Sequence, residues 1–396
     1  MNEDNRFFES LSDVDDKYVI EAMPEIKPKK LSFKYIAAGI CAASICAAAV
    51  GVIVLHNTKK APDMPYSKNY HYSFEYQDEN NHLEKIKPDP GVDGMGFEGF
   101  WAHDVSELLE NNPWTKECSL TSLPVFAESN NEIFSMENYY SAEEMKDRLS
   151  GISDELGGEF NVTNEPADGS YIEASVYGAR LKMQSSGQIN INFNGVLNLP
   201  EKYRISDGCG RENAEAAVNY LAERYYDVLK FEYPVPSVYT DYDIYSKPYT
   251  RFEVYDKSDD PLTAILNFNF RKASFSGNGD LEYICIYDNL ACKTVVGMYP
   301  IIDYETAEKM LMDGDYTTTV WEENRLPDGF EADDVTFSGL YYKRTEDYKY
   351  NIPYYRFLIE LQNSNLPEDM KEYGAFYVPA IAPEYLTDVN TDTAFN

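Results

Sequence analysis

Histidine is scarce in this chain of 396 residues, which holds only four, at His56, His71, His82 and His103. No two of them have the spacing of metal ligands, and no cluster of His, Cys and carboxylate suggests a zinc site. Catalysis by a Ser or Cys nucleophile needs a His in the folded part of the chain, and only His103 meets that need. Neither a GxGxxG pattern nor a phosphate-binding P-loop occurs. We therefore expect no cofactor and no catalytic residue of these types.

Cysteine is also sparse, with six residues and no CxxC pair. Two of them, Cys41 and Cys46, lie in an apolar segment, which leaves Cys118, Cys209, Cys285 and Cys292. Four cysteines are too few for a disulfide framework in so long a chain. Two disulfides, one of them closing a short loop between Cys285 and Cys292, and buried free thiols are both compatible with this pattern.

Basic residues number 34 against 68 acidic ones, so the formal net charge is −34 at pH 7. Nucleic-acid binding depends on clustered Lys and Arg, and we expect no nucleic-acid partner. The aromatic content of 14%, with 34 Tyr, indicates that most of the chain folds. The acid excess fits a cationic partner or simple solubility.

Long apolar runs are missing apart from one, Ile36 to Leu55, with the sequence IAAGICAASICAAAVGVIVL. A hydrocarbon core of ~30 Å is crossed by about 20 apolar residues in a helix. The run therefore predicts one transmembrane helix in a cell membrane. Lys residues before it favour a cytoplasmic N-terminus and an extracellular C-terminal domain. A cleaved signal peptide is the alternative.

Small residues recur at every fourth position of this run, at Gly39, Ala43, Ala47 and Gly51. They would share one helix face, where small side chains let two helices approach closely and form a homodimer. The simpler interpretation is that Ala and Gly are common in membrane anchors.

The composition divides the chain into seven parts. Residues 1–34 read as a cytoplasmic tail, 35–56 as the transmembrane helix, 57–92 as an extended Pro-containing spacer and 389–396 as a disordered tail. Three α+β modules are expected between them, at 93–200 with a short helical cap, at 201–300 and at 301–388.

Each module is expected to place a helix before its strands. Helices are predicted over 141–156, 211–230 and 304–312, the first with a capping box between Ser141 and Glu144. Strands are predicted over 171–177, 179–184, 188–193, 249–255, 262–276 with a break, 281–287, 334–344, 354–361 and 374–378. The predicted fold class is thus α+β, with one N-terminal transmembrane helix and an ectodomain of repeated helix-plus-antiparallel-sheet modules.

A short repeat singles out candidate ligand-binding residues. KPYTRF, from Lys247, and IPYYRF, from Ile352, each open a predicted strand. Within each, Tyr and Arg stand two residues apart and share one face of the strand, where the guanidinium can lie over the ring. The pairs are Tyr249 with Arg251 and Tyr354 with Arg356. They either mark a structural corner kept after duplication or line a face that binds an anion or a peptide.

The third module resembles a known family. Its segments YPIIDYETAEKMLMDG (Tyr299 to Gly314), VTFSGLYYKR, PYYRF and YGAFYVPAI follow the order of PepSY-like modules and of the extracytoplasmic parts of membrane-anchored sensor-kinase regulators. Ala307 and the run Tyr377-Val378-Pro379-Ala380 match the family pattern loosely. Pro379 stands where Asp or Asn is expected, and the following Thr-Gly is missing. The resemblance implies a binding or inhibitory module.

These observations lead to a functional hypothesis. We expect a membrane-anchored, extracytoplasmic protein that binds or regulates without catalysis, with an envelope or membrane protein as its partner. A carbohydrate or cell-wall binder, suggested by the many Tyr, is the alternative. A hydrolase that relies on two carboxylates is a third.

Overall fold

A computed structural model describes residues 83, 86, 99–127, 140–243, 245–290, 293–318, 320, 330–345, 349–362, 366–367 and 369–387. All of them belong to one compact unit of the chain, Thr58–Asn396. The predicted cytoplasmic tail and transmembrane helix, with Gly39, Ala43, Ala47 and Gly51, lie outside these residues. Of the predicted spacer only Leu83 and Ile86 are described, and Ile86 is buried and pairs with Leu386.

The prediction of a single-pass membrane topology requires correction. Among the residues that the structure describes, no helix is both long and apolar enough to span a membrane. The longest helices have 14 residues, whereas a span needs about 20.

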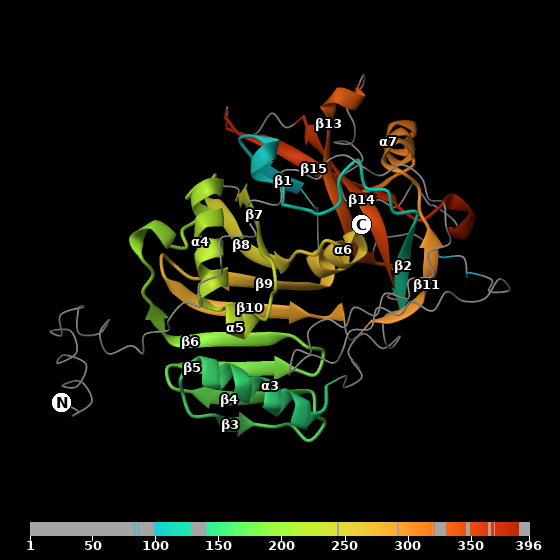
Figure 1. Ribbon diagram of the computed structural model, residues 1–396. Coiled ribbons are helices and arrows are strands. Elements are labelled where there is room, and N and C mark those ends of the chain that lie inside the picture. Colours follow the sequence, from blue (N-terminus) through green and yellow to red (C-terminus); the bar gives the residue numbers. More distant parts are fainter. Residues whose placement is uncertain are drawn as a thin grey trace. The chain divides into compact units, whose positions relative to one another are not determined.

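The first of two sheets has eight antiparallel strands in the order β3-β4-β5-β6-β10-β9-β8-β7 (Figure 1). Its strands are β3 (Asn161–Asn164), β4 (Tyr171–Val176), β5 (Ala179–Gln184), β6 (Ile189–Leu197), β7 (Pro234–Tyr242), β8 (Pro248–Asp256), β9 (Arg271–Ser276) and β10 (Leu281–Asp288). All eight come from one continuous stretch of chain.

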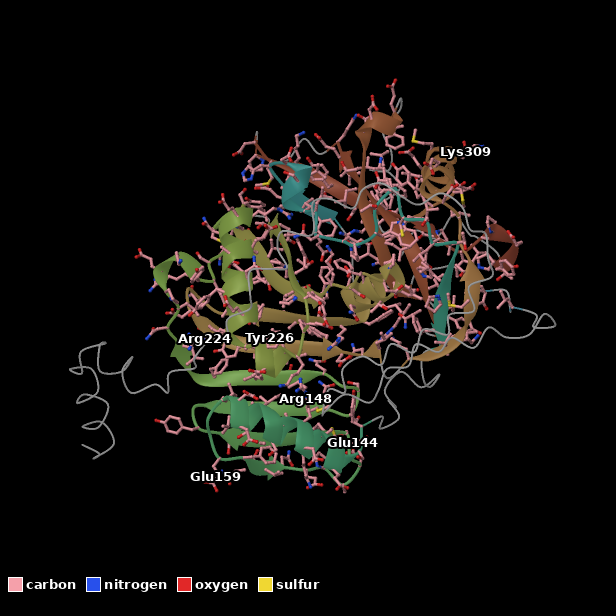
Figure 2. All side chains as sticks on the ribbon, in the orientation of Figure 1. Glu144, Arg148, Glu159, Arg224, Tyr226 and Lys309 are labelled. Atoms are coloured by element: carbon pink, nitrogen blue, oxygen red, sulfur yellow. The ribbon has the colours of Figure 1, made fainter. Side chains whose placement is uncertain are left out.

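Helices α3 (Ala142–Glu155), α4 (Arg211–Arg224) and α5 (Tyr226–Leu229) pack on one face of this sheet. The helix α3 begins at the predicted capping box, in which Ser141 accepts from the Glu144 amide and the Glu144 carboxylate accepts from the Ser141 amide. Arg148 of α3 donates to the Val228 carbonyl of α5 at 2.9 Å; Figure 2 labels Arg148 on this side.

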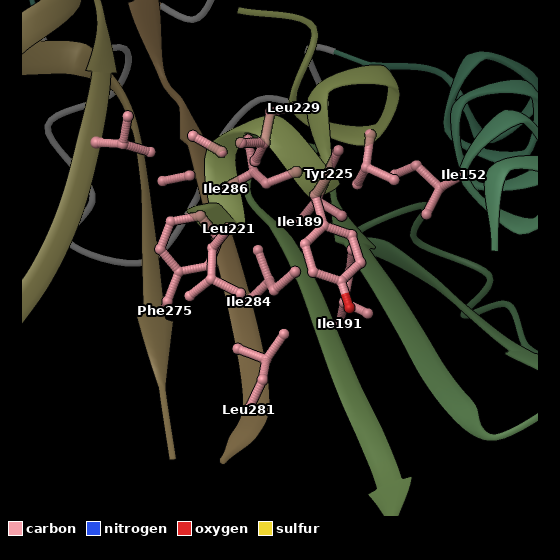
Figure 3. Packing of buried hydrophobic residues seen from close by; sticks show 14 of the residues in the cluster. Ile152, Ile189, Ile191, Leu221, Tyr225, Leu229, Phe275, Leu281, Ile284 and Ile286 are labelled. Carbon is pink, nitrogen blue, oxygen red and sulfur yellow. The ribbon is translucent and has the colours of Figure 1, made fainter. Parts of the chain in front are cut away.

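The core under these helices is built from alternate strand residues. Figure 3 shows Ile189 and Ile191 of β6 beside Ile284 and Ile286 of β10, close to Leu221 and Leu229 of the helices. Each is at most 3% exposed, so this side of β6 and β10 is sealed from water.

The second sheet has seven strands, β1 (Gly99–Ala102), β2 (Ser122–Ala127), β11 (Thr294–Pro300), β12 (Thr317–Thr318), β13 (Val335–Arg344), β14 (Tyr350–Leu361) and β15 (Lys371–Pro379). The order is β1-β15-β14-β2-β11, with β12 beside β15 and β13 beside β14. Both faces are buried: along β15, Tyr373, Ala375 and Tyr377 join one apolar cluster, and Phe376 and Val378 join another.

Two helices pack with this second sheet. The helix α7 (Tyr304–Asp313) contacts β15, and α6 (Pro261–Phe270) contacts β13 as well as β8 and β9 of the first sheet. Short 3-10 turns complete the described elements: η1 (Val105–Glu107), η2 (Glu201–Tyr203), η5 (Ala332–Asp334) and η6 (Pro383–Tyr385).

The expected array of repeated modules is wrong. The described chain is mostly β-sheet, and it forms two antiparallel sheets instead of three helix-on-sheet units. The strand β6 of the first expected module pairs with β10 of the second, while β11 pairs with β2 in the other sheet. Local patterns identify strands, but they carry no information on which distant strand becomes the partner.

One expected strand is a helix. Residues 262–276 were predicted as an interrupted strand, whereas α6 occupies 261–270 and only β9 is extended. The Asp260 carboxylate caps α6 at the Thr263 amide, and Pro261 takes the first helical position, where its missing N–H costs nothing. An apolar run buried on all sides shows no helical period and was therefore misread.

Candidate ligand-binding face

The side of the eight-stranded sheet that faces away from α3 and α4 is polar. Residues that alternate with the core positions supply it: Tyr171, Glu173, Arg180, Lys182, Gln184, Gln188, Asn190, Asn192, Ser237, Tyr239, Asp241, Tyr249, Arg251, Glu253, Lys272, Ser274, Tyr283, Cys285 and Tyr287. We call this set the polar face. Val235 of β7 and Tyr255 of β8 lie on the same side by register, where Tyr255 packs on Phe268 of α6. Most members of the polar face are half-buried or exposed.

The strand register lines these residues up in rows. Glu173 is opposite Lys182, Lys182 opposite Asn190, and Asn190 opposite Cys285. The row continues through Ser274 and Glu253 to Ser237. Side chains opposite one another in this way are close enough to interact, as the 3.3 Å ion pair between Lys182 Nζ and Glu173 Oε1 shows.

Cys285 stands at the centre of the polar face. Its thiol lies 3.1 Å from Asn190 Oδ1, and Gln188 Nε2 donates to the sulfur at 3.5 Å. Burial raises the pKa of this thiol despite hydrogen bonds from Tyr287, Gln188 and Tyr283 that lower it. A raised pKa keeps the thiol protonated and a weak nucleophile, so Cys285 fits a packing and hydrogen-bonding role.

Two tyrosines flank Cys285 on β10. Burial raises the pKa of Tyr287 to about 12, and the Cys285 thiol adds to the shift. Burial and the same thiol also raise the pKa of Tyr283. Both phenols therefore remain neutral at physiological pH and serve as hydrogen-bond donors and acceptors.

At the β7–β8 end, the polar face meets residues of the second sheet. Lys272 Nζ contacts Glu253 Oε2 at 2.6 Å. Burial works to lower the pKa of Lys272, but the carboxylates of Glu253 and Glu110 outweigh it and raise that pKa. Lys272 therefore stays protonated and positively charged where the polar face meets the second sheet.

Glu110 joins the two sheets. Its carboxylate accepts hydrogen bonds from Tyr341 Oη at 2.9 Å and Ser237 Oγ at 3.2 Å, and it pairs with Arg356 Nη2 at 3.4 Å. The side chains of Glu110 and Arg356 are 7% and 11% exposed. A pair this buried is stable only when its remaining groups are satisfied, and Ser338 Oγ and Tyr341 Oη each lie 2.7 Å from Arg356 Nη2.

The four residues of the PYxRF repeat do not form one site. Tyr249 and Arg251 lie on the polar face, with the guanidinium 4.7 Å from the ring centre and Tyr249 49% exposed. Tyr354 is fully buried against Tyr377, in the middle of the second sheet. Arg356 lies over the ring of Tyr341, not of Tyr354, at 3.8 Å.

A cavity of about 300 Å³ opens beside Tyr249 at the end of the β7–β8 hairpin. Its wall holds three carboxylates, together with Tyr242, Lys247 and Pro248. The carboxylates of Asp207 and Asp243 accept backbone hydrogen bonds from Thr250 and from Tyr245 and Lys247. Burial raises the pKa of the third, Asp241. Two of the three groups therefore hold turns in place.

Residues of catalytic types are dispersed. His103, which is the single histidine of the described part, contacts Glu107, Asp369 and the ring of Tyr242, none of which is a Ser or Cys nucleophile. Cys118, Cys209 and Cys285 are free thiols, and Cys292 lies outside the described residues. Within the described ranges, no group of three His, Cys, Asp or Glu residues could hold a metal ion.

The sequence pattern pointed to only Tyr249 and Arg251 on this face. The other members alternate with core residues, as in YIEASV of β4 and ININF of β6, and from these segments only the strands themselves were predicted. No protein-family model, curated protein or solved structure matches the chain. The site is therefore interpreted from its own geometry.

Proposed function

We propose that the chain is a non-catalytic binding protein and that the polar face is its ligand-binding surface. The observation that carries the proposal is the contrast between the two faces of the eight-stranded sheet. One is sealed by α3, α4 and α5, and the other presents Tyr, Asn, Gln and Ser side chains across seven strands.

The composition of the face argues against a merely solvated surface. Its charged members are four cations, Arg180, Lys182, Arg251 and Lys272, and three anions, Glu173, Asp241 and Glu253. The whole chain has twice as many acidic as basic residues. A surface that only confers solubility would share the overall acid excess, whereas this one is close to neutral.

The aromatic members favour recognition. Tyr171, Tyr239, Tyr249, Tyr283 and Tyr287 combine a flat apolar ring with a hydroxyl. Tyr contributes contact area at a low cost in conformational entropy, and Ser and Asn contribute adaptable hydrogen bonds. This combination is typical of surfaces that bind polar ligands.

The hydrolase alternative has less support. The cavity beside Tyr249 holds three carboxylates, but Asp207 and Asp243 are occupied by backbone amides. The carboxylates of Glu110 and Glu253 are paired with Arg356 and Lys272.

The test is a thermal-shift screen of the full chain against one panel of soluble oligosaccharides and one of short peptides. The wild-type protein and the variant Tyr177→Ser are expected to be stabilised by at least one panel member. The double variant Tyr283→Ser, Tyr287→Ser is expected to lose that response. Tyr177 is the matched control because it is 94% exposed and lies outside the polar face.

Three outcomes would contradict the proposal: no binder in either panel, a binder that the double variant still binds with unchanged affinity, or conversion of the bound compound to a product. Circular dichroism of the double variant verifies that the sheet still forms.

A further inference from the structure

The centre of the polar face offers hydrogen-bonding groups that both donate and accept. Gln188, Asn190 and Asn192 carry amides, and Tyr283 and Tyr287 carry neutral hydroxyls. An amide donates through its NH₂ and accepts through its oxygen. A ligand that matches such a surface needs many groups that also do both, and hydroxyl groups are of this kind.

The paired backbone of the sheet disfavours a peptide as the ligand of the polar face. Strands β4, β5, β6, β10, β9 and β8 each have a paired strand on both sides, so their backbone groups are already satisfied. An extended peptide adds to a free sheet edge, and a helical peptide needs an apolar groove. From β4 to β8 the polar face provides neither. Its outer strand β7 is a sheet edge, but Pro234 and Pro236 there lack the N–H that an added strand would need.

The charges disfavour an ionic polymer. The four cations and three anions of the face nearly cancel, and two of the cations are paired, Lys182 with Glu173 and Lys272 with Glu253. Charges that cancel in this way neither attract nor exclude a neutral chain, while the net charge of −34 repels a polyanion.

Two aromatic rings stand at opposite ends of the face. Lys182 Nζ lies 3.9 Å from the ring centre of Tyr171 on β4, and the Arg251 guanidinium lies 4.7 Å from that of Tyr249 on β8. Such cation–π contacts orient the rings. Five strand spacings separate β4 from β8, or about 24 Å across the sheet. The register also sets the two tyrosines six residues apart along the strands, or about 20 Å, so the rings lie about 30 Å apart on a diagonal. A ligand that touches both rings is a chain of several units.

We infer that the polar face binds a neutral oligosaccharide chain, which lies diagonally across the strands with sugar rings against Tyr171 and Tyr249 and hydroxyl groups on the Asn, Gln and Tyr side chains between them. This inference rests on the proposed function, because it names the ligand class of the same surface.

The experiment is isothermal titration calorimetry of the full chain with cellohexaose, xylohexaose, chitohexaose and laminarihexaose, and with the disaccharide of each series. At least one hexasaccharide is expected to bind, and to bind about tenfold or more tightly than its disaccharide. Tyr171→Ala and Tyr249→Ala are each expected to weaken it by about 3- to 10-fold, whereas Tyr177→Ala leaves it unchanged. Thermal unfolding of each variant verifies its fold.

The outcomes separate this inference from the function on which it rests. If a peptide binds and the Tyr283/Tyr287 double variant loses it, while no hexasaccharide binds, the ligand class is wrong and the binding role stands. If hexasaccharide and disaccharide bind equally, or if Tyr171→Ala and Tyr249→Ala have no effect, the proposed site for a chain of several sugar units is wrong. If neither class binds, both proposals fail.

Discussion

Among single residues, Glu110 connects the two sheets through its side chain. It belongs to no strand, yet it accepts hydrogen bonds from Ser237 of the first sheet and Tyr341 of the second and pairs with Arg356. A buried charge is tolerated only with its partners in place. Glu110 therefore holds the base of the polar face against the second sheet.

The variant Glu110→Ala is expected to lower the free energy of unfolding by about 3–5 kcal/mol, because the buried Arg356 guanidinium loses its ion pair with the Glu110 carboxylate. Chemical denaturation followed by circular dichroism measures the change. The matched control is Glu360→Ala, which removes an exposed ion pair to Lys371 whose side chains are 50% and 46% exposed. That control should lower the free energy of unfolding by at most about 1 kcal/mol. Equal effects in the two variants would show that the Glu110 contacts do not stabilise the packing of the two sheets.

Within elements, the outer edge of β13 is closed by side chains. Asn269 of α6 accepts from the Tyr342 amide at 2.8 Å and donates to the Leu340 carbonyl at 3.4 Å, and Asn112 donates to the same carbonyl at 3.1 Å. The amide of Asn269 thus replaces a neighbouring strand, and an edge covered in this way cannot recruit another chain.

Replacing Asn269 with Ala is expected to destabilise the fold by about 1–3 kcal/mol, since the Tyr342 amide loses its acceptor. Hydrogen exchange should also speed up at Tyr342. Asn161→Ala, on the exposed strand β3, is the control and should change stability by less than about 0.5 kcal/mol. Unchanged exchange at Tyr342 would contradict the assigned role of Asn269.

Local sequence signals predicted elements more successfully than pairings. The Ser141 capping box predicted the start of α3, and the alternation in β4 and β5 predicted two strands of the first sheet. The strand β7 was not predicted. It contains Pro234 and Pro236, and Pro is tolerated at a sheet edge such as this one.

The candidate site was predictable only in part for the same reason. The repeat drew attention to Tyr249 and Arg251, but equally to Tyr354, which is buried because β14 lies between β15 and β2. Strand order decides which polar residues become neighbours, and no local pattern encodes it. The resemblance of the third module to PepSY-like proteins stays a prediction.

For the whole molecule, the buried tyrosines limit the stability of the fold at alkaline pH. Burial raises the pKa of Tyr239, Tyr255 and Tyr287 to about 12, and it also raises the pKa of Tyr341, Tyr342 and Tyr355. In the unfolded chain these phenols ionise near pH 10. Their contribution to stability is therefore complete below pH 10 and is lost as the pH rises toward 12.

We expect cooperative unfolding between about pH 10 and pH 12, with tyrosinate absorbance at 295 nm rising together with the loss of circular dichroism. Gradual titration of most tyrosines near pH 10, without loss of structure, would contradict this account. A parallel experiment at high salt tests the contribution of the −34 net charge, whose self-repulsion salt screens.

The placement of the eight strands β3 to β10 between β2 and β11 has a consequence for the order of events on the ribosome. The first sheet is complete once residue 288 has emerged, whereas β1 must wait for β15, and β2 can pair first with β11 and only later with β14. Translation delivers β14 and β15 only after residue 349, so a nascent chain holds a finished first sheet with β1 unpaired for several seconds. Arrested chains that expose residues up to about 290 outside the ribosome should therefore protect the first sheet from protease while β1 and β2 are still cut.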